Sequence, residues 1–299
     1  MDGIINVYKP AGMSSFSCVK KVSRLLGEKK AGHGGTLDPE ATGILPVFLG
    51  KATKMADFMH DYDKSYRAGF LLGKTTDSYD IWGNVVSETD ADKLSLITEE
   101  QIRQILEGFV GECTQTPPAY SAIKINGTPA YKLARAGKDV EIKSRTVNIY
   151  TINIVSYDVK NHTGIFDVSC SKGTYVRSIC HDLGVALGCG ACMCSLERTQ
   201  YGPFCIENSA VPDECTENNV LACDYLLQDV PVVELCDDDA KKYASGNLKN
   251  VRKSEVCGDL TESQGFLRIY NGGRLFALAK IDKNCSDDYV GLMSFKFFG

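Results

Sequence analysis

The chain has 299 residues, of which 43% are hydrophobic and 24% are charged, and its formal net charge at pH 7 is −5. This composition is typical of a soluble globular protein, and the length allows about two domains. No apolar run approaches the roughly 18 residues of a membrane span, and the first residues lack a signal-peptide pattern. We therefore expect a cytoplasmic protein without a membrane partner.

The negative charge is concentrated in one stretch of the chain. Residues 205–239 contain ten acidic side chains and neither Lys nor Arg, which leaves 33 basic and 28 acidic residues elsewhere. Binding to a polyanion depends on the local surface rather than on the total charge. The net charge therefore does not exclude a nucleic acid as the partner.

The thirteen cysteines are an odd number in a long chain, so free thiols in a reducing compartment are expected rather than disulfides. Cys189, Cys192 and Cys194 lie near His181 in the sequence and raise the question of a zinc site. They lack a second pair at the spacing of a zinc finger or zinc ribbon. We interpret them as small buried hydrophobic residues and expect no metal.

The first predicted elements are a strand and a helix. Residues 3–9 have the pattern of a short strand that ends at a Lys-Pro pair. Ser14 or Ser15 can cap a helix that runs to about Leu26, and Gly27 is a natural stop.

Residues 31–46 form a glycine-rich segment centred on Asp38. The glycines allow positive φ angles and a close approach of the backbone to a ligand. Pro39 disfavours a helical conformation at Asp38, so the carboxylate is expected on an extended or turn segment. A carboxylate presented beside His33 in this way suits a nucleophile or a general base. The alternative is a surface turn in which Asp-Pro only shapes the backbone.

Strands and helices alternate in the next part of the chain. The predicted elements are a strand over 44–49, a helix over 52–59, a strand over 64–73 and a helix that a capping box opens at 98–101. Residues 75–84 form a polar loop that holds Trp82, the only tryptophan.

Residues 114–147 combine aromatic and basic side chains in a segment that Pro and Gly interrupt. Long excursions of this kind are usually functional or disordered. Aromatic rings can stack on bases and cations can bind phosphates, which suits a single-stranded or looped RNA. The alternative is a surface hairpin with its tyrosines packed beneath it. The side chains concerned are Tyr120, Tyr131, Lys124, Lys132, Arg135, Lys138, Lys143 and Arg145.

The remaining sequence is predicted to be rich in strands. Residues 171–177 lead from a strand into a helix that ends at Gly188, so Arg177 is expected at this transition. From about residue 230, one helix and several short strands predict a small β domain. The predicted strands are 147–157, 164–170, one that begins at 196, 266–270, 275–281 and 292–297, and the predicted helix is 238–244.

Four separated motifs carry a resemblance to a known family. Residues 32–47, Gly-His-Gly-Gly-Thr-Leu-Asp-Pro-Glu-Ala-Thr-Gly-Ile-Leu-Pro-Val, resemble the active-site signature of the bacterial tRNA pseudouridine-55 synthases, the TruB family. The order and spacing of the other motifs agree, and the resemblance spans residues 3–203. One departure is Ser65, where the family often has a second basic residue. The other motifs are Lys64-Ser-Tyr-Arg67, Gln115-Thr-Pro-Pro-Ala-Tyr-Ser-Ala-Ile-Lys124 and Ser171-Lys-Gly-Thr-Tyr-Val-Arg177.

The resemblance implies an α+β fold with a central mixed, largely antiparallel sheet flanked by helices, the pseudouridine synthase fold. It also implies a small C-terminal PUA-like β-barrel domain that binds RNA. We accordingly expect a catalytic domain over residues 1–229, with the excursion at about 114–147, and the second domain over residues 230–299.

The resemblance further implies that the protein isomerises uridine 55 in the T-loop of tRNA to pseudouridine after flipping the base out. Asp38 would be the nucleophile, and attack at uracil C6 or at the sugar C1′ both remain open. Arg177 would keep Asp38 ionised as its ion-pair partner. Tyr66 would stack on the flipped base and is a candidate to take the proton from C5.

Further residues are assigned by the same resemblance. Tyr175 and Leu196 would line the pocket, and His33 would occupy the space left by the extruded nucleotide or bind its phosphate. The implied partner is the T-stem-loop of tRNA, with a monomeric enzyme and no cofactor. The expected RNA contacts are Lys9, Lys124, Lys132, Arg135 and Arg145.

Two other classes of function remain open at this point. One is a non-catalytic protein that binds or folds RNA on the same scaffold. The other is a small-molecule lyase or hydrolase that uses Asp38 and His33, but it leaves the aromatic and basic excursion unexplained.

Overall fold

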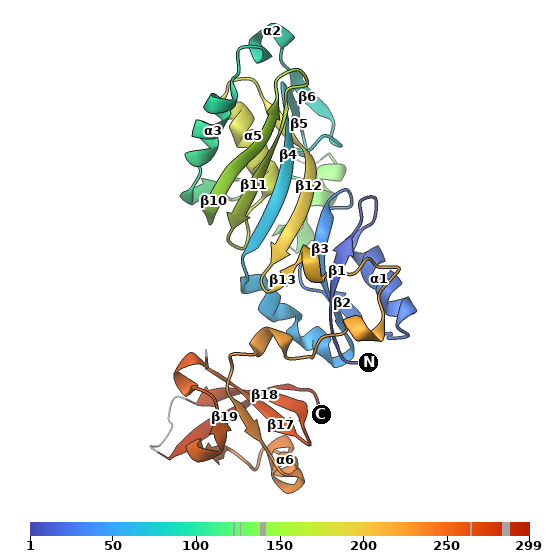
Figure 1. The fold of residues 1–299 in the computed structure, drawn as a ribbon, viewed down its shortest axis with the longest axis vertical. Helices are drawn as coiled ribbons and strands as arrows, with labels where there is room; N and C mark the ends of the chain where they lie inside the picture. Colours follow the sequence, from blue (N-terminus) through green and yellow to red (C-terminus); the bar gives the residue numbers. More distant parts are fainter. Residues whose placement is uncertain (122, 126, 138–141, 264, 283–287) are drawn as a thin grey trace.

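The computed structural model describes residues 1–121, 123–125, 127–137, 142–263, 265–282 and 288–299. Figure 1 shows two sheets placed one after the other along the long axis of the molecule, with the N-terminus near their junction. The strands of the larger sheet lie within residues 3–205, and those of the smaller sheet lie within residues 232–297.

The larger sheet has nine strands, and its main path runs β1-β3-β12-β4-β11-β10-β7. Its pairings are antiparallel except for β3 with β12, so the sheet is mixed and largely antiparallel. The strands are β1 (Gly3–Lys9), β2 (Ala31–His33), β3 (Thr42–Leu49), β4 (Lys64–Leu72), β7 (Gly111–Gln115), β10 (Arg145–Asp158), β11 (Thr163–Cys170), β12 (Ala191–Tyr201) and β13 (Phe204–Cys205).

Helices cover this sheet and bury its apolar core. α5 packs on β12, and α3 packs on β10 and α5. Two predicted helix starts are confirmed, because Ser14 caps α1 and Thr98 with Gln101 forms the capping box of α3. The predicted helix over 52–59 is a longer 3₁₀ helix, η1. The elements are α1 (Ser15–Leu25), η1 (Gly50–Asp61), β5 (Lys74–Thr76), β6 (Val85–Glu88), α2 (Ala91–Leu94), α3 (Glu99–Glu107) and α5 (Val176–Ala186).

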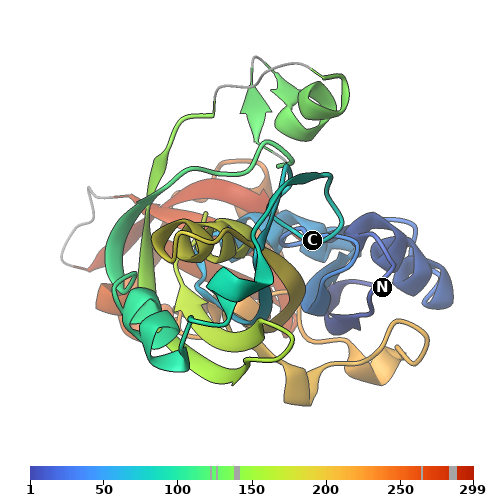
Figure 2. The same cartoon turned by 90° about the horizontal axis from the view of Figure 1, so that it is seen from above.

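The predicted excursion leaves the sheet between two neighbouring strands. β7 and β10 pair directly, with Gln115 opposite Arg145, so residues 116–144 form a long insertion between them. Figure 2 shows the part with α4 standing away from the sheet. The insertion contains β8 (Lys124–Ile125), β9 (Thr128–Pro129) and α4 (Ala130–Arg135).

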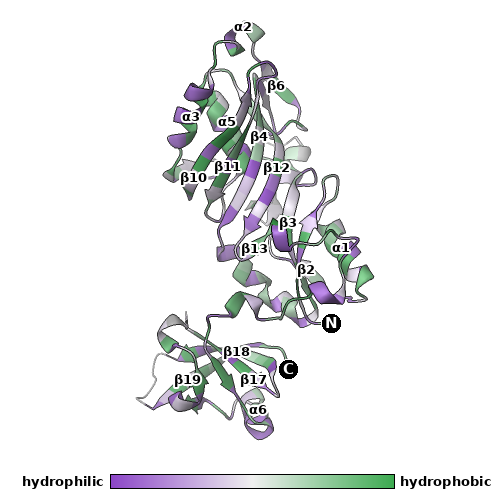
Figure 3. Ribbon diagram, in the orientation of Figure 1, coloured by the Kyte–Doolittle hydropathy of each residue, from purple (hydrophilic) through white to green (hydrophobic). Residues whose placement is uncertain are grey.

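The smaller sheet has six strands in the order β15-β19-β18-β17-β14-β16. Figure 3 shows hydrophobic residues along β17 and β18 and hydrophilic residues on α6, as expected for a helix with one face in water. Three single-turn 3₁₀ helices between Ile206 and Leu227 connect the two sheets. The elements are β14 (Val232–Glu234), α6 (Asp237–Ala244), β15 (Asn250–Arg252), β16 (Val256–Cys257), β17 (Phe266–Asn271), β18 (Arg274–Asp282) and β19 (Tyr289–Phe297).

An apolar cluster joins the two sheets. Phe48 and Met55 of the larger unit belong to one buried cluster with Leu278 and Phe298 of the smaller unit. The ring of Phe58 in η1 also meets Phe266 edge to face, with 5.6 Å between the ring centroids. Because η1 directly follows β3, the smaller sheet supports the same part of the chain that carries the glycine-rich segment.

The cysteines that the structure describes are free, as predicted, and Cys189 and Cys192 are buried. Cys194, which was also predicted to be buried, is half-buried. The strand predicted to begin at 196 begins at Ala191, so Cys192 and Cys194 lie within β12. Among the described residues, no group of three His, Cys, Asp or Glu side chains is placed to hold a metal ion, and no helix is long and apolar enough to cross a membrane.

Candidate active site

A large cavity lies where the Asp38 segment faces the start of α5. Its volume is about 1390 Å³, and it is lined by the segment after β2, by β4 and β12, by the 77–84 loop and by the beginning of the 116–144 insertion. The sequence placed Asp38, Tyr66 and Arg177 far apart along the chain, and the structure brings all three to this cavity. Tyr175, Leu196 and His33 line it as well.

Lys9 of β1 binds the backbone next to Asp38. Its side chain is fully buried, and its ammonium donates to the backbone oxygens of Pro10, Met13 and Pro39 at 2.8, 2.7 and 2.9 Å. Each proton of the ammonium therefore has an acceptor inside the protein. This corrects the sequence-based assignment of Lys9 as an RNA contact, because the group has no surface to offer to a phosphate.

Ser15 fixes the residue before Asp38. The hydroxyl of Ser15 donates to the carbonyl of Leu37 and accepts from the Leu37 N–H, both at 2.9 Å. Leu37 is itself buried in the core, so the backbone on the N-terminal side of Asp38 is held by packing and by hydrogen bonds. A carboxylate on such a segment is pre-positioned for reaction.

Arg198 holds the other side of the segment, and the sequence analysis missed it. Its guanidinium is buried and donates to the carbonyls of Ile44 and Gly35 at 2.7 and 3.1 Å. The hydroxyl of Tyr201 donates to the carbonyl of Gly34 at 2.9 Å. The signal in the sequence was a basic residue inside a predicted strand, which is costly to bury unless its donors are satisfied.

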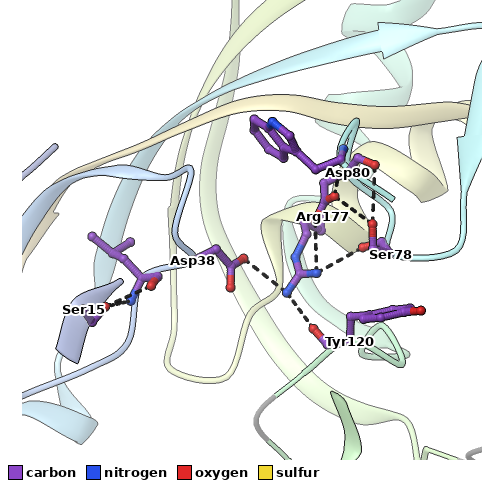
Figure 4. Close-up of polar contacts among 8 residues, drawn as sticks. Ser15, Asp38, Ser78, Asp80, Tyr120 and Arg177 are labelled. Atoms are coloured by element: carbon purple, nitrogen blue, oxygen red, sulfur yellow. Dashed lines mark hydrogen bonds and ion pairs between the residues drawn. The ribbon is translucent and has the colours of Figure 1, made fainter. Parts of the chain in front are cut away.

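Asp38 and Arg177 form an ion pair across the cavity. The distance between Arg177 Nη2 and Asp38 Oδ2 is 3.2 Å. The Arg177 side chain is 7% exposed, whereas the Asp38 side chain is 44% exposed. The guanidinium is thus part of the protein interior, and the carboxylate is exposed at the cavity. Figure 4 shows the Asp38 side chain pointing toward Arg177.

Arg177 has further partners that fix its position. Its Nη1 lies 3.1 Å from the carbonyl oxygen of Ser78 and 3.3 Å from Asp80 Oδ2. Its Nη2 also donates to the carbonyl of Tyr120 at 3.0 Å. The fork of guanidinium donors thereby joins α5, the 77–84 loop and the start of the insertion. The sequence predicted residues 75–84 only as a polar loop, and Asp80 was not among the predicted site residues.

Two aromatic rings hold the 77–84 loop in place. Tyr79 has a positive φ of 65°, which is unusual for a bulky residue. Its ring stacks on His181 of α5, with 3.9 Å between the centroids and 8° between the planes. His181 lies one helical turn after Arg177, so the loop is fixed to the helix that carries Arg177.

Tyr66 lies in the wall of the cavity on β4, where it pairs with Arg198 of β12 and Val168 of β11. Burial raises the pKa of Tyr66 to about 12. The phenol is therefore neutral at pH 7, and its ring is available to stack on a base. His33 is also neutral at pH 7, because burial and the nearby Arg198 lower its pKa.

Basic side chains lie around another part of the cavity. Burial and the neighbouring Arg198 lower the pKa of Lys64 to about 8. Lys172 forms an ion pair with Asp61 at 2.5 Å, and the Arg145 guanidinium lies 5.2 Å from the ring centre of Tyr175. Lys132 is exposed on α4. The side chains of Lys124 and Arg135, which were also predicted RNA contacts, lie outside the described part of the structure.

Two protein-family models match this chain. Residues 23–176 match the N-terminal domain of the TruB family pseudouridylate synthases, and residues 177–226 match the C-terminal domain of tRNA pseudouridylate synthase B. The chain belongs to the TruB family of pseudouridylate synthases. It is therefore an isomerase that converts uridine to pseudouridine in tRNA.

Curated relatives agree with the TruB assignment over the full length. The tRNA pseudouridine synthase B of Clostridium tetani is 42% identical over 289 residues, which cover 95% of this chain and 96% of the relative. The enzyme of the same name from Clostridioides difficile is 39% identical, and the match covers both chains completely.

Solved structures agree with the TruB assignment at the level of the fold. A chain in the crystal structure of a Cbf5-Nop10-Gar1 complex is 26% identical, with a TM-score of 0.69 over 99% of this chain and 85% of that chain. A chain in the structure of an H/ACA RNP bound to a substrate RNA containing 2′-deoxyuridine has a TM-score of 0.68 at 24% identity. The predicted pseudouridine synthase fold with a C-terminal PUA-like sheet is thus confirmed.

Proposed function

We propose that this enzyme isomerises uridine 55 in the T-loop of tRNA and that Asp38 is its nucleophile. The observation that carries the proposal is the ion pair between Asp38 and Arg177 in the wall of a cavity that can hold a nucleoside. Family membership supplies the reaction and the class of RNA, and the motif around Asp38 supplies the position in the tRNA.

The reaction rearranges one nucleoside without gain or loss of atoms. The bond between uracil N1 and C1′ of the ribose breaks, the uracil turns, C5 bonds to C1′, and the proton on C5 moves to N1. Asp38 assists by attacking uracil C6 or the ribose C1′, and both routes require an ionised carboxylate. Arg177 stabilises that charge through the ion pair at 3.2 Å.

The other cavity residues bind the flipped nucleoside in this proposal. Tyr66 stacks on the uracil, and Tyr175 with Leu196 encloses it. His33 occupies the space that the nucleotide leaves in the RNA, or it binds the adjacent phosphate. Flipping a base costs a few kcal/mol and is cheapest in a loop, which favours a T-loop uridine over one in a duplex.

RNA contacts beyond the flipped nucleoside offset the cost of flipping. We assign residues 1–229 to catalysis and residues 230–299 to RNA binding, with the 116–144 insertion gripping the T-stem-loop. Lys132 and Arg145 are proposed phosphate contacts, as are Lys124 and Arg135. Such contacts position the RNA and make its affinity depend on salt.

Mapping of pseudouridine in a treated tRNA tests the proposal. An unmodified tRNA transcript is incubated with the pure wild-type protein in EDTA, and every pseudouridine is located by chemical labelling and reverse transcription. We expect one new pseudouridine, at position 55. Modification only at another position would contradict the assigned specificity, and no modification would contradict the proposed function.

A further inference from the structure

Trp82 is the only tryptophan in the chain, and 51% of its surface is exposed. It lines the same cavity as Asp38. We propose that Trp82 is a stacking platform for an unpaired RNA base next to the target uridine. This inference rests on the proposed function and adds to it a binding site for a second nucleotide.

The loop that carries Trp82 is rigid enough to act as a platform. Asp77 accepts from the Asn84 N–H and side-chain amide at 2.9 Å each, which closes the loop at its base. The Ile81 N–H donates to the carbonyl of Met193 in β12 at 2.8 Å. The indole is therefore presented by a fixed backbone, and stacking on it requires little ordering of the protein.

Trp82 is linked to the reaction centre by one carboxylate. Asp80 Oδ1 accepts from the backbone N–H of Trp82 at 3.2 Å, and Asp80 Oδ2 lies 3.3 Å from Arg177 Nη1. Arg177 in turn pairs with Asp38. A nucleotide adjacent to a uridine bound at Asp38 would thus reach the wall that carries the indole.

The size of the cavity supports a second nucleotide. Its volume of about 1390 Å³ exceeds the roughly 300–1,000 Å³ of sites that hold one drug-sized molecule. One uridine nucleoside would leave part of this space unfilled. An exposed aromatic side chain in the remaining part fits a flat ligand with a π-face, and every RNA base has one.

The charges near Trp82 favour a base over a phosphate. The carboxylates of Asp77 and Asp80 lie in the same loop and line the same cavity, so this wall repels anions. Lys172 and Arg145 line another part of the cavity, where phosphates would bind. An uncharged base can stack on the indole beside the acidic wall. The phosphates of the same RNA can then lie near Lys172 and Arg145.

Fluorescence tests this proposal directly, because Trp82 is the only tryptophan and excitation at wavelengths too long for the tyrosines to absorb reports on it alone. The Asp38→Asn variant is titrated with a T-stem-loop RNA, and binding is measured in parallel by filter retention. We expect the emission to fall by more than about half and to saturate with the binding curve. An RNA with an abasic site after the target uridine should bind about tenfold or more weakly and quench little at saturation.

Two outcomes of the titration would overturn the platform. One is unchanged emission when filter retention shows saturation. The other is an equal loss of emission with the abasic RNA, which would show that a protein segment covers Trp82. Failure of wild-type protein to form pseudouridine would instead defeat the proposed function itself, so the two failures are distinguishable.

Kinetics with the active enzyme give a second test. Trp82→Ser should raise KM for the RNA about tenfold to hundredfold with kcat within about twofold, and Trp82→Phe should restore most of the affinity. The matched control is Leu96→Ser, because Leu96 is 76% exposed and lies outside the cavity lining. Its kinetics should equal those of the wild type. An unchanged KM in Trp82→Ser would contradict the proposal.

Discussion

At the scale of single residues, the asymmetry between Asp38 and Arg177 is the central feature of the site. Arg177 forms an ion pair with Asp38 and donates to three acceptors, on Asp80, Ser78 and Tyr120. It therefore keeps three acceptors when Asp38 turns toward a substrate. The protein thus fixes the cation and leaves the carboxylate accessible, which is the arrangement that a nucleophile needs.

Arg177→Met should abolish most of the activity, because it leaves Asp38 and the largely buried Asp80 without their shared cation. We predict a loss of at least about a hundredfold in the single-turnover rate on a T-stem-loop RNA. Removing one partner of a buried pair also destabilises the fold by about 3–5 kcal/mol, which urea unfolding would measure. Arg103→Met is the control, since Arg103 makes only exposed ion pairs. A near-normal rate would refute the role of the pair.

Lys64 should make RNA binding depend on pH. Its pKa is lowered to about 8 by burial and by Arg198, so the ammonium loses its charge between pH 7 and pH 9. A neutral amine attracts a phosphate less, so the Kd for a T-stem-loop should rise by about fivefold over this range. The Kd of Lys64→Met should rise much less. Equal pH profiles for the two proteins would exclude Lys64 from the RNA contact.

At the scale of elements, the 77–84 loop and α5 act together on the catalytic pair. Periodicity predicted α5 and placed Arg177 at its start, and the glycines and Pro39 predicted an extended Asp38 segment. Sequence could not predict that Asp80, Arg198 and Lys9 hold this pair and its segment in place. Lys9 and Arg198 bond to backbone oxygens of other segments, and Asp80 pairs with a residue on α5. The local sequence pattern around each residue does not predict such long-range contacts.

Asp80→Asn should reduce turnover more than RNA binding, because Asp80 positions Arg177 and acts on the reaction only through it. A charge-assisted hydrogen bond is worth about 1.5–3 kcal/mol, so kcat should fall about tenfold to a hundredfold with KM within about threefold. Steady-state kinetics on a tRNA transcript would measure both constants. Asp92→Asn, an exposed change on α2, should leave them unchanged. A rise in KM alone would show that Asp80 contacts the RNA instead.

At the scale of the whole molecule, the two sheets share one hydrophobic core. The apolar cluster around Phe48, Leu278 and Phe298 spans both, and Lys296 of β19 bonds to Asp57 of η1 at 2.9 Å. Three of the six strands of the smaller sheet, β17, β18 and β19, were predictable from their own patterns, whereas the two- and three-residue strands β14, β15 and β16 were not. The docking of this sheet on η1 was not predictable either, because the residues that make the junction are separated by more than 200 positions.

Phe298→Ala should destabilise the whole protein and not only the smaller sheet. Phe298 is buried in the shared cluster, and truncation of a buried Phe costs about 3–5 kcal/mol. We predict one cooperative unfolding transition in both the wild type and the variant, shifted to lower denaturant in the variant. The control is Phe16→Ala, since Phe16 is exposed on α1, and its shift should be small. Two separate transitions in the wild type would contradict a shared core.

The most direct test of the central claim is a single-turnover assay of Asp38→Asn with excess enzyme over T-stem-loop RNA. The variant keeps the size of the side chain and removes only its charge. We predict no detectable pseudouridine, with a Kd for the RNA within about threefold of the wild type. Pseudouridine formed by this variant at a rate comparable to the wild type would show that Asp38 is not the nucleophile.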